Sequence, residues 1–203
     1  MTTLLNTYAK RQLVLGSSSE PRKMLLERLQ IPFEIAAPDI DETPLLNETP
    51  ADLVLRLAES KARIIAKQFP DALIIGADQV GVLNGKIQGK PLTQENAIKQ
   101  LTEASGQPIA FYIGLCLFDA RNNTVQISLE TFDVVYRELT QEMIQQYLQK
   151  EQPLHCAGSC QAEGLGIALI DAFHGKDFSA LIGLPLIRLV RMLETAGLNP
   201  LSA

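Results

Sequence analysis

Residues 51–66 read ADLVLRLAESKARIIA, and residues 72–83 read ALIIGADQVGVL. At about 100° per residue, the first run predicts a helix with one apolar arc, made of Leu53, Val54, Leu57, Ile64 and Ile65. The second run begins with a continuous apolar stretch, which is typical of a buried strand. A helix that leads into a buried strand predicts an α/β fold with helices packed on a sheet.

One charge in this helix is misplaced. The other charged residues lie opposite the apolar arc: Asp52, Arg56, Glu59, Arg63 and Lys67. Lys61 points into the arc, one turn beyond Leu57 and one turn before Ile65. Because a buried ammonium is costly unless an anion meets it, the sequence predicts a negative partner beneath the helix. That partner is either a carboxylate of the chain, such as Asp78, or an anionic ligand.

The flanking segments extend the same architecture. Upstream, the sequence predicts a strand, a serine loop, a helix, a second strand and an acidic loop, at residues 12–16, 17–19, 21–29, 33–37 and 39–50. Downstream, it predicts a hairpin turn at Asn84-Gly85, strands at 108–119 and 124–136, and helices at 93–104, 140–149 and 185–195. Segment 154–182 is glycine-rich and shows no clear pattern. We therefore expect a mixed α/β fold, with a mixed sheet and flanking helices, in one domain of two lobes over residues 1–203.

Composition limits the classes of partner. The chain has 203 residues, of which 46% are hydrophobic and 20% charged, with a net charge of −5. This balance is typical of a globular protein with a real core, and it argues against binding to nucleic acid or a membrane surface. The N-terminus lacks the pattern of a signal peptide, and the three cysteines, odd in number and unevenly spread, argue against a disulfide framework. We expect a cytoplasmic location.

Arg22 repeats the anomaly of Lys61. It shares a helical face with Leu25, Leu26 and Leu29, and it lies in the first turn, where the helix dipole disfavours a cation. A bound anion would resolve both problems, because free N–H groups at a helix start suit phosphate. The hydroxyl groups of the preceding loop, which includes Ser17, would add donors. The alternative is an arginine that simply reaches solvent from a frayed first turn.

Carboxylates complete the pattern. Asp78 ends a buried apolar run, where it suits metal ligation or general-base catalysis, or alternatively caps a turn. Glu42 lies in an acidic loop, and such clusters either are solvated or hold Mg²⁺ or Mn²⁺ beside phosphates. Lys90 stands in a rigid Gly-Lys-Pro turn. The sequence contains neither a Walker motif nor a GxGxxG motif. Together these residues predict a site for a polyphosphate and a divalent cation.

Several short motifs occur in the order of a known family. They are Ser17-Ser18-Ser19-Glu20-Pro21-Arg22-Lys23, Asp41-Glu42-Thr43, Glu59-Ser60-Lys61-Ala62, Gly76-Ala77-Asp78-Gln79-Val80, Gly89-Lys90-Pro91 and Gly183-Leu184-Pro185. From about residue 12 to the C-terminus, the chain resembles the Maf family of nucleotide pyrophosphatases. Asp78-Gln79, and the run from His155 to Ser159 with Glu163-Gly164, resemble the subgroup that acts on 7-methyl-GTP.

The resemblance implies a Maf/ITPase-like fold, often dimeric, with the active site in a cleft between two lobes. It implies metal-dependent hydrolysis of a nucleoside triphosphate to the monophosphate and pyrophosphate, as a house-cleaning activity against modified nucleotides. Asp78 matches the catalytic residue of the family and Glu42 a further acidic position. The residues that match its phosphate-side positions are Ser17, Arg22, Lys61 and Lys90, and those that match positions of substrate choice are Pro21, Gln79 and Glu163.

Three alternatives remain open at this stage. The chain could be a Maf-type pyrophosphatase for dTTP, UTP or another modified nucleotide. It could be a non-catalytic regulator, since members of the family have been linked to septum formation. Lys61 could also be a structural ion-pair partner of Asp78 with no ligand at all. The sequence departs from the family pattern at Glu20-Pro21, where Pro21 removes an aromatic ring that could stack on a base.

Overall fold

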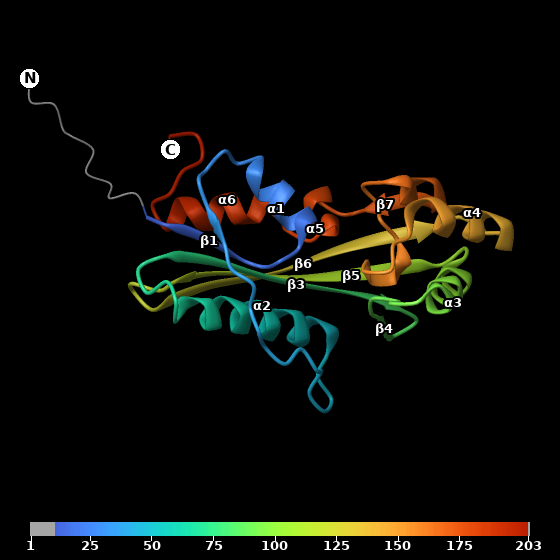
Figure 1. Cartoon of the computed structure of the whole chain (residues 1–203), viewed down its shortest axis with the longest axis horizontal. Helices are drawn as coiled ribbons and strands as arrows, with labels where there is room; N and C mark the ends of the chain where they lie inside the picture. Colours follow the sequence, from blue (N-terminus) through green and yellow to red (C-terminus); the bar gives the residue numbers. More distant parts are fainter. Residues whose placement is uncertain (1–10, 203) are drawn as a thin grey trace, which may run out of the picture.

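The structure, a computed structural model, describes residues 11–202. Within these residues, one seven-stranded sheet has the order β2-β1-β3-β5-β6-β7, and β4 pairs with β3 outside this path (Figure 1). The strands are β1 (Leu13–Gly16), β2 (Glu34–Ile35), β3 (Leu73–Leu83), β4 (Lys86–Gln88), β5 (Pro108–Asp119), β6 (Thr124–Tyr136) and β7 (Ile170–His174). The mixed α/β architecture predicted from the sequence is therefore confirmed.

The direction of the strands brings the loops after β1 and the middle of β3 together. β1 runs parallel to β2 and to β3, with Gly16 opposite Gly76. All other neighbours in the sheet are antiparallel. β1 and β3 run in the same direction, and Asp78 lies two residues after Gly76. The serine loop, which follows Gly16, therefore begins beside the part of β3 that contains Asp78. The carboxyl end of a strand in such a sheet is a common place for a ligand.

Helices cover both faces of the sheet at one end of the molecule (Figure 1). α2 (Pro50–Ala66) packs on one face, and α1 (Glu20–Glu27), α5 (Phe178–Ile182) and α6 (Leu186–Thr195) lie on the other. A buried apolar cluster joins β1, β3 and β5 to α1 and α6 on one side, and a second cluster joins these strands to α2 on the other. The sheet at this end is therefore buried from both sides.

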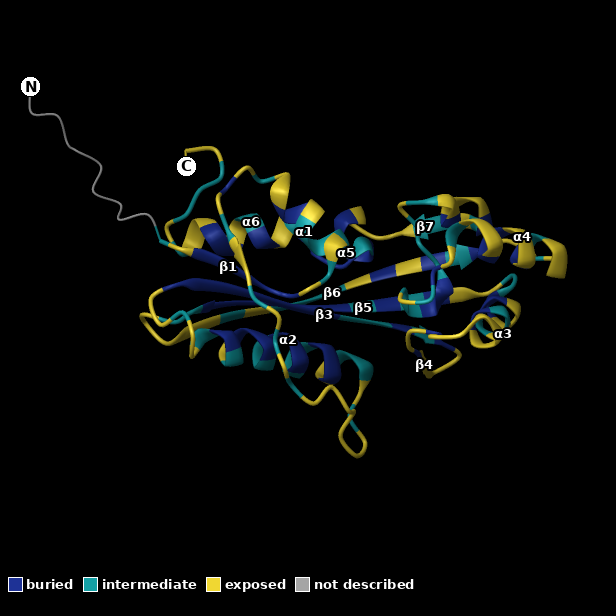
Figure 2. Ribbon diagram, viewed as in Figure 1, coloured by how far each residue is buried: buried dark blue, intermediate teal, exposed yellow. Residues whose placement is uncertain are grey.

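The opposite end of the sheet has a core of its own. The long strands β3, β5 and β6 extend to this end, where α3 (Gln94–Ala104) and α4 (Gln141–Glu151) pack against them (Figure 2). Two short 3₁₀ segments, η1 (Ala157–Ser159) and η2 (Leu165–Leu169), complete this side. The two ends are joined by continuous strands, and organisation as a single domain stays a prediction. No helix of the described residues is long and apolar enough to span a membrane.

Some local predictions need correction. Ile64 is only partly buried, because it lies at the margin of the arc that α2 turns towards the sheet. The strand expected over residues 33–37 is reduced to Glu34–Ile35, which pair with β1 along one short stretch. Segment 154–182 contains η1, η2, β7 and α5, none of which the sequence pattern indicated.

Candidate active site

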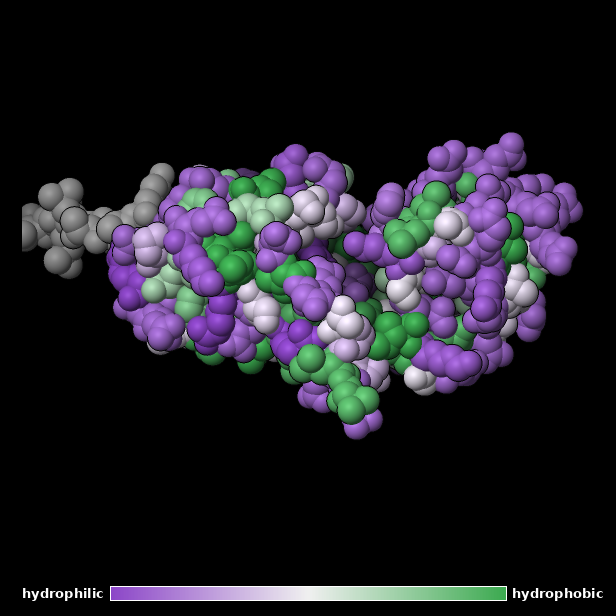
Figure 3. Space-filling view, turned by 60° about the horizontal axis from the view of Figure 1, so that its bottom comes forward, coloured by the Kyte–Doolittle hydropathy of each residue, from purple (hydrophilic) through white to green (hydrophobic). Residues whose placement is uncertain are grey.

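A large cavity lies where the two ends of the molecule meet, and the space-filling view is hollowed there (Figure 3). Its volume is about 880 Å³, which lies within the usual range for small-molecule sites. The residues that line it include all nine site residues expected from the sequence: Ser17, Pro21, Arg22, Glu42, Lys61, Asp78, Gln79, Lys90 and Glu163. Residues as far apart as 17 and 163 in the chain thus face one space.

Lys61 has the negative partner that its position in α2 demands. Its ammonium Nζ lies 2.7 Å from Asp78 Oδ1 and 2.7 Å from Glu42 Oε1. Lys61 and Asp78 are buried, whereas the Glu42 side chain is 55% exposed. The partners are therefore carboxylates of the chain itself, as one of the two alternatives proposed. The group is nevertheless not sealed in the core, because all three residues line the cavity.

A close approach of helix and strand produces this contact. At Gly76 of β3, a Cβ atom would lie 2.0 Å from the carbonyl oxygen of Ala58 in α2, so only glycine fits there. Asp78 follows two residues later on the same strand and faces the same side of the sheet, because side chains alternate along a strand. Lys61 follows Ala58 by one helical step of three residues, which keeps it over the same strand. Packing at Gly76 thereby sets the distance between ammonium and carboxylate.

Burial controls the protonation of Asp78. Removal from water raises the pKa of this carboxyl group, and the charge and hydrogen bond of Lys61 oppose that rise only in part. Arg22 also lowers this pKa, whereas Glu42 raises it. A carboxylate with a raised pKa is a better proton acceptor than an ordinary aspartate, which is the property that a general base needs.

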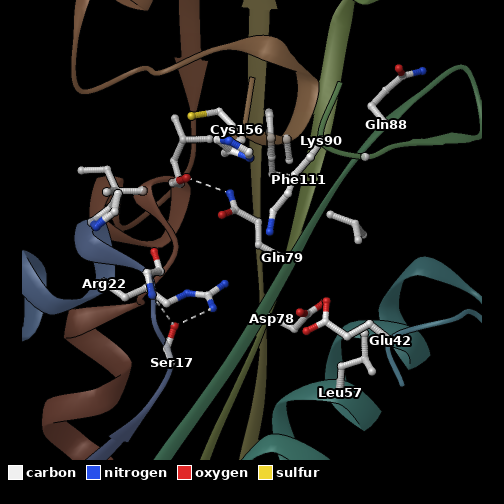
Figure 4. A pocket seen from close by; sticks show the side chains of 18 of the residues that line it. Ser17, Arg22, Glu42, Leu57, Asp78, Gln79, Gln88, Lys90, Phe111 and Cys156 are labelled. Carbon is white, nitrogen blue, oxygen red and sulfur yellow. Dashed lines mark hydrogen bonds between the residues drawn. The ribbon is translucent and has the colours of Figure 1, made fainter. Parts of the chain in front are cut away.

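Arg22 enters the cavity from the first turn of α1. Its Nε donates to the carbonyl oxygen of Gly183 at 2.9 Å. Its Nη1 donates to Ser17 Oγ at 3.4 Å, as Figure 4 shows. Burial lowers the pKa of Arg22, while Asp78 and Glu42 raise it. The side chain is therefore not the solvent-exposed arginine of the alternative interpretation. The side chain of Ser19, the residue before α1, accepts no capping hydrogen bond. It therefore leaves the first backbone N–H groups of this helix unoccupied.

The other residues approach from elements at the far side of the cavity. Lys90 follows β4, is exposed, and forms no ion pair with any residue that the structure describes. Figure 4 shows its side chain directed towards Gln79, whose Nε2 donates to the carbonyl oxygen of Leu181 at 2.7 Å. Glu163 lies between η1 and η2, and partial desolvation raises its pKa. A free ammonium and a carboxylate are thus both available to a ligand from this side.

Glu20, which departs from the expected motif, lines the cavity, but its charge is paired with a lysine of its own helix. Its carboxylate accepts from Lys23 Nζ at 2.9 Å, and the side chain is 65% exposed. This pair neutralises the extra negative charge on the surface of α1. Pro21 lies between Glu20 and Arg22 and also lines the cavity.

Sequence reasoning missed two backbone acceptors and several further lining residues. The carbonyl oxygens of Leu181 and Gly183 hold Gln79 and Arg22, and the only signal for them was the Gly183-Leu184-Pro185 motif. Cys156 and Cys160 also line the cavity, but burial raises the pKa of their thiols to about 11 and about 12. Neither thiol is therefore a thiolate near neutral pH, and the site is not built for cysteine nucleophiles.

The carboxylates fit a divalent cation only together with a substrate. Among the described residues, no group of three or more histidine, cysteine, aspartate or glutamate side chains could hold a metal ion. Asp78 Oδ1 and Glu42 Oε1 each lie 2.7 Å from the same ammonium, so the distance between these two oxygens is no more than twice that value. Two carboxylates are a typical protein contribution to a Mg²⁺ site in which phosphate oxygens and water supply the remaining ligands.

Comparison with known proteins gives two sequence matches over nearly the whole chain. The family model described as Maf-like protein matches residues 12–196. A 7-methyl-GTP pyrophosphatase from Nitrosococcus oceani is 56% identical over 193 residues, which cover 95% of this chain and 97% of that protein.

Two solved structures are more weakly similar. A HAM1 protein from Coxiella burnetii has a TM-score of 0.48 and 21% identity, over 64% of this chain and 74% of that chain. The Ham1 protein of Staphylococcus aureus has a TM-score of 0.46 and 15% identity, over 63% of this chain and 73% of that chain. The family assignment rests on the sequence matches and not on these two structures. By its match over residues 12–196 and its high identity to a curated relative, the chain belongs to the Maf family.

Proposed function

We propose that the protein hydrolyses 7-methyl-GTP to 7-methyl-GMP and pyrophosphate, and so removes a modified nucleotide. The observation that carries this proposal is one cavity lined by a buried Asp78–Lys61 pair, two further cations and a carboxylate at its far side. The 56% identity to a 7-methyl-GTP pyrophosphatase supports the same substrate. A cytoplasmic location and a possible homodimer stay predictions.

The proposed reaction breaks the bond between the α-phosphorus and the bridging oxygen of the β-phosphate. A water molecule attacks the α-phosphorus, gives its proton to the Asp78 carboxylate, and pyrophosphate leaves with the bridging oxygen. Asp78 is suited to this step because its pKa is raised and its Oδ1 lies in the cavity wall beside Lys61. Direct ligation of a metal ion by Asp78 is the other role that its position permits.

The cations of the cavity would neutralise the leaving group. Negative charge develops on pyrophosphate in the transition state, where cations fixed before the reaction are most effective. Lys61 and Arg22 are held in place by hydrogen bonds, and Lys90 is free to contact the phosphates. Mg²⁺ or Mn²⁺, held by Asp78 and Glu42, would polarise the phosphate oxygens and lower the pKa of the attacking water.

Glu163 and Gln79 are proposed to select the base. A carboxylate accepts from N1–H and the exocyclic amine of guanine, and it favours the positive charge that N7-methylation adds. Uracil and thymine present carbonyl oxygens around a single ring donor, so a glutamate repels them. Both residues line the same cavity as the phosphate-side cations, which is the geometry that a nucleotide needs.

Pyrophosphate release from a panel of triphosphates tests the proposal. The panel contains 7-methyl-GTP, GTP, dTTP and UTP, each assayed with Mg²⁺, with Mn²⁺ and after removal of metal by a chelator. We expect the highest kcat/KM for 7-methyl-GTP and loss of activity with the chelator. A preference for dTTP or UTP would establish the alternative pyrophosphatase, and no release from any nucleotide would favour the septum-formation regulator.

A further inference from the structure

Arg22 and Gln79 are held by the same short segment of backbone. The carbonyl oxygen of Gly183 accepts from Arg22 Nε at 2.9 Å, and that of Leu181 accepts from Gln79 Nε2 at 2.7 Å. Each bond fixes which atoms remain for a ligand. The terminal nitrogens of Arg22 stay on the cavity side, and the amide oxygen of Gln79 stays free of this contact (Figure 4).

Gly183 fits between these two side chains because it has no Cβ atom. Its φ of +121° lies in a region that other residues rarely adopt. A Cβ atom here would lie 3.2 Å from Gln79 Oε1 and 3.3 Å from Arg22 Nε. A small displacement of this turn would therefore move a phosphate-side cation and a base-side amide at the same time.

One carboxylate outside the cavity ties this segment at both ends. Asp177 Oδ1 accepts from the backbone N–H of Ser179 at 2.9 Å and from its hydroxyl at 2.5 Å. Asp177 Oδ2 accepts from the backbone N–H of Ile187 at 2.9 Å, and Ser179 Oγ accepts from that of Leu186 at 2.9 Å. The starts of α5 and α6 are thus joined across the turn that contains Gly183.

We propose that Asp177 is a positioning residue, which through the turn at Gly183 orients Arg22 and Gln79 towards the substrate. Asp177 does not line the cavity, so its effect must pass through the backbone. The segment also has apolar anchors, since Ala180 and Leu184 are 2% and 0% exposed. Loss of the carboxylate should therefore loosen the turn without removing it from the core. The identity of the substrate in this inference rests on the proposed function.

The main experiment compares Asp177→Ala with Thr140→Ala. Thr140 caps α4 by accepting from the N–H of Met143, so its loss also removes a helix cap, but it has no link to Arg22 or Gln79. We expect Asp177→Ala to lower kcat/KM for 7-methyl-GTP about tenfold, because small misplacements of binding groups are costly. The preference for 7-methyl-GTP over GTP should fall as well. Thr140→Ala should keep both the rate and the preference.

A spectroscopic measurement separates this inference from the choice of substrate. The Nε–H signal of Arg22, identified by its loss in Arg22→Lys, reports the bond to Gly183 with no nucleotide present. We expect faster exchange of this proton with solvent in Asp177→Ala and wild-type exchange in Thr140→Ala. If wild-type protein prefers another nucleotide of the panel, the proposed substrate fails, but the exchange result still decides the role of Asp177.

Ser179→Ala provides a second test, for the case in which Asp177→Ala does not fold. It removes the bond to the N–H of Leu186 and one bond to Asp177, while the carboxylate keeps its two backbone contacts. We expect kcat/KM and the preference for 7-methyl-GTP to fall less than in Asp177→Ala, with faster exchange of the Arg22 Nε–H proton than in wild type. Wild-type exchange and wild-type nucleotide preference in the folded variants would overturn the inference.

Discussion

The two sides of the cavity are built from different kinds of structure. Lys61 and Asp78 lie on a long helix and a central strand and are 5% and 7% exposed. Lys90 and Glu163 lie in loops at the other side and are exposed. Regular elements hold a side chain more precisely than loops do, and loops change with less cost to the core. In the proposed reaction, the buried side therefore supplies the base and a fixed cation, whereas the exposed side supplies Lys90 to the phosphates and Glu163 to the nucleobase.

Asp78→Asn is the strongest test of this difference between the two sides. The amide keeps the shape of the side chain but cannot accept the proton of water, so kcat should fall at least about 10³-fold. Nucleotide binding, measured by calorimetry with the inactive variant, should be largely retained. Asp133→Asn, on an exposed position of β6, is the matched control and should behave like wild type. Full turnover by Asp78→Asn would remove Asp78 from the mechanism.

Replacement of the buried cation should have the next largest effect. In Lys61→Met, kcat should fall about 100-fold, because a fixed charge beside the leaving group is lost. The pKa of Asp78 should also rise further, since Lys61 lowers it more than any other group does. Asp78 must be ionised to act, so activity declines as pH falls through its pKa. The acidic limb of the kcat/KM profile should therefore move to higher pH in the variant.

Arg63→Met is the control for this experiment. Arg63 lies on the same helix outside the cavity, is 46% exposed, pairs with Glu59 and packs over the ring of Phe118. Its profile should match that of wild type. An acidic limb that stays in place in Lys61→Met would show that Asp78 does not set it.

A substitution on the exposed side should have a smaller effect, and the quantity that changes should be the substrate preference. Glu163→Gln should reduce the preference for 7-methyl-GTP over UTP about tenfold, because a hydrogen bond to a charged group contributes about 1.5–3 kcal/mol. Its melting temperature should stay close to that of wild type, because the side chain is exposed. Glu103→Gln on the surface of α3 is the matched control. An unchanged substrate profile would argue against base selection by Glu163.

The sequence predicted those parts of the molecule in which one pattern dominates. The hairpin of β5 and β6 was predicted with its observed bounds, because Arg121-Asn122-Asn123 separates two long strand-like runs. α2 was predicted to within one residue, and its misplaced lysine pointed to the cavity. Charges that violate an apolar pattern are informative because burial makes them costly.

The other parts of the fold and of the site depend on contacts that leave no local pattern in the sequence. Segment 154–182 is folded by contacts with β6 and α4, and its short elements have no clear period. The contact of Glu42 with Lys61 comes from a loop without regular structure. Backbone carbonyls such as those of Leu181 and Gly183 are present at every residue, so no residue type marks them as binding groups.

The missing methyl group at Gly76 has a consequence for how this enzyme can vary. Any side chain there would push α2 off the sheet and draw Lys61 away from Asp78, although neither of those residues had changed. Loss of activity would then arise from a substitution that alters no charge, no polar group and no residue of the cavity wall. The effect of a natural substitution in this protein therefore depends on whether it changes the spacing between α2 and the sheet, as well as on whether it changes a reactive group.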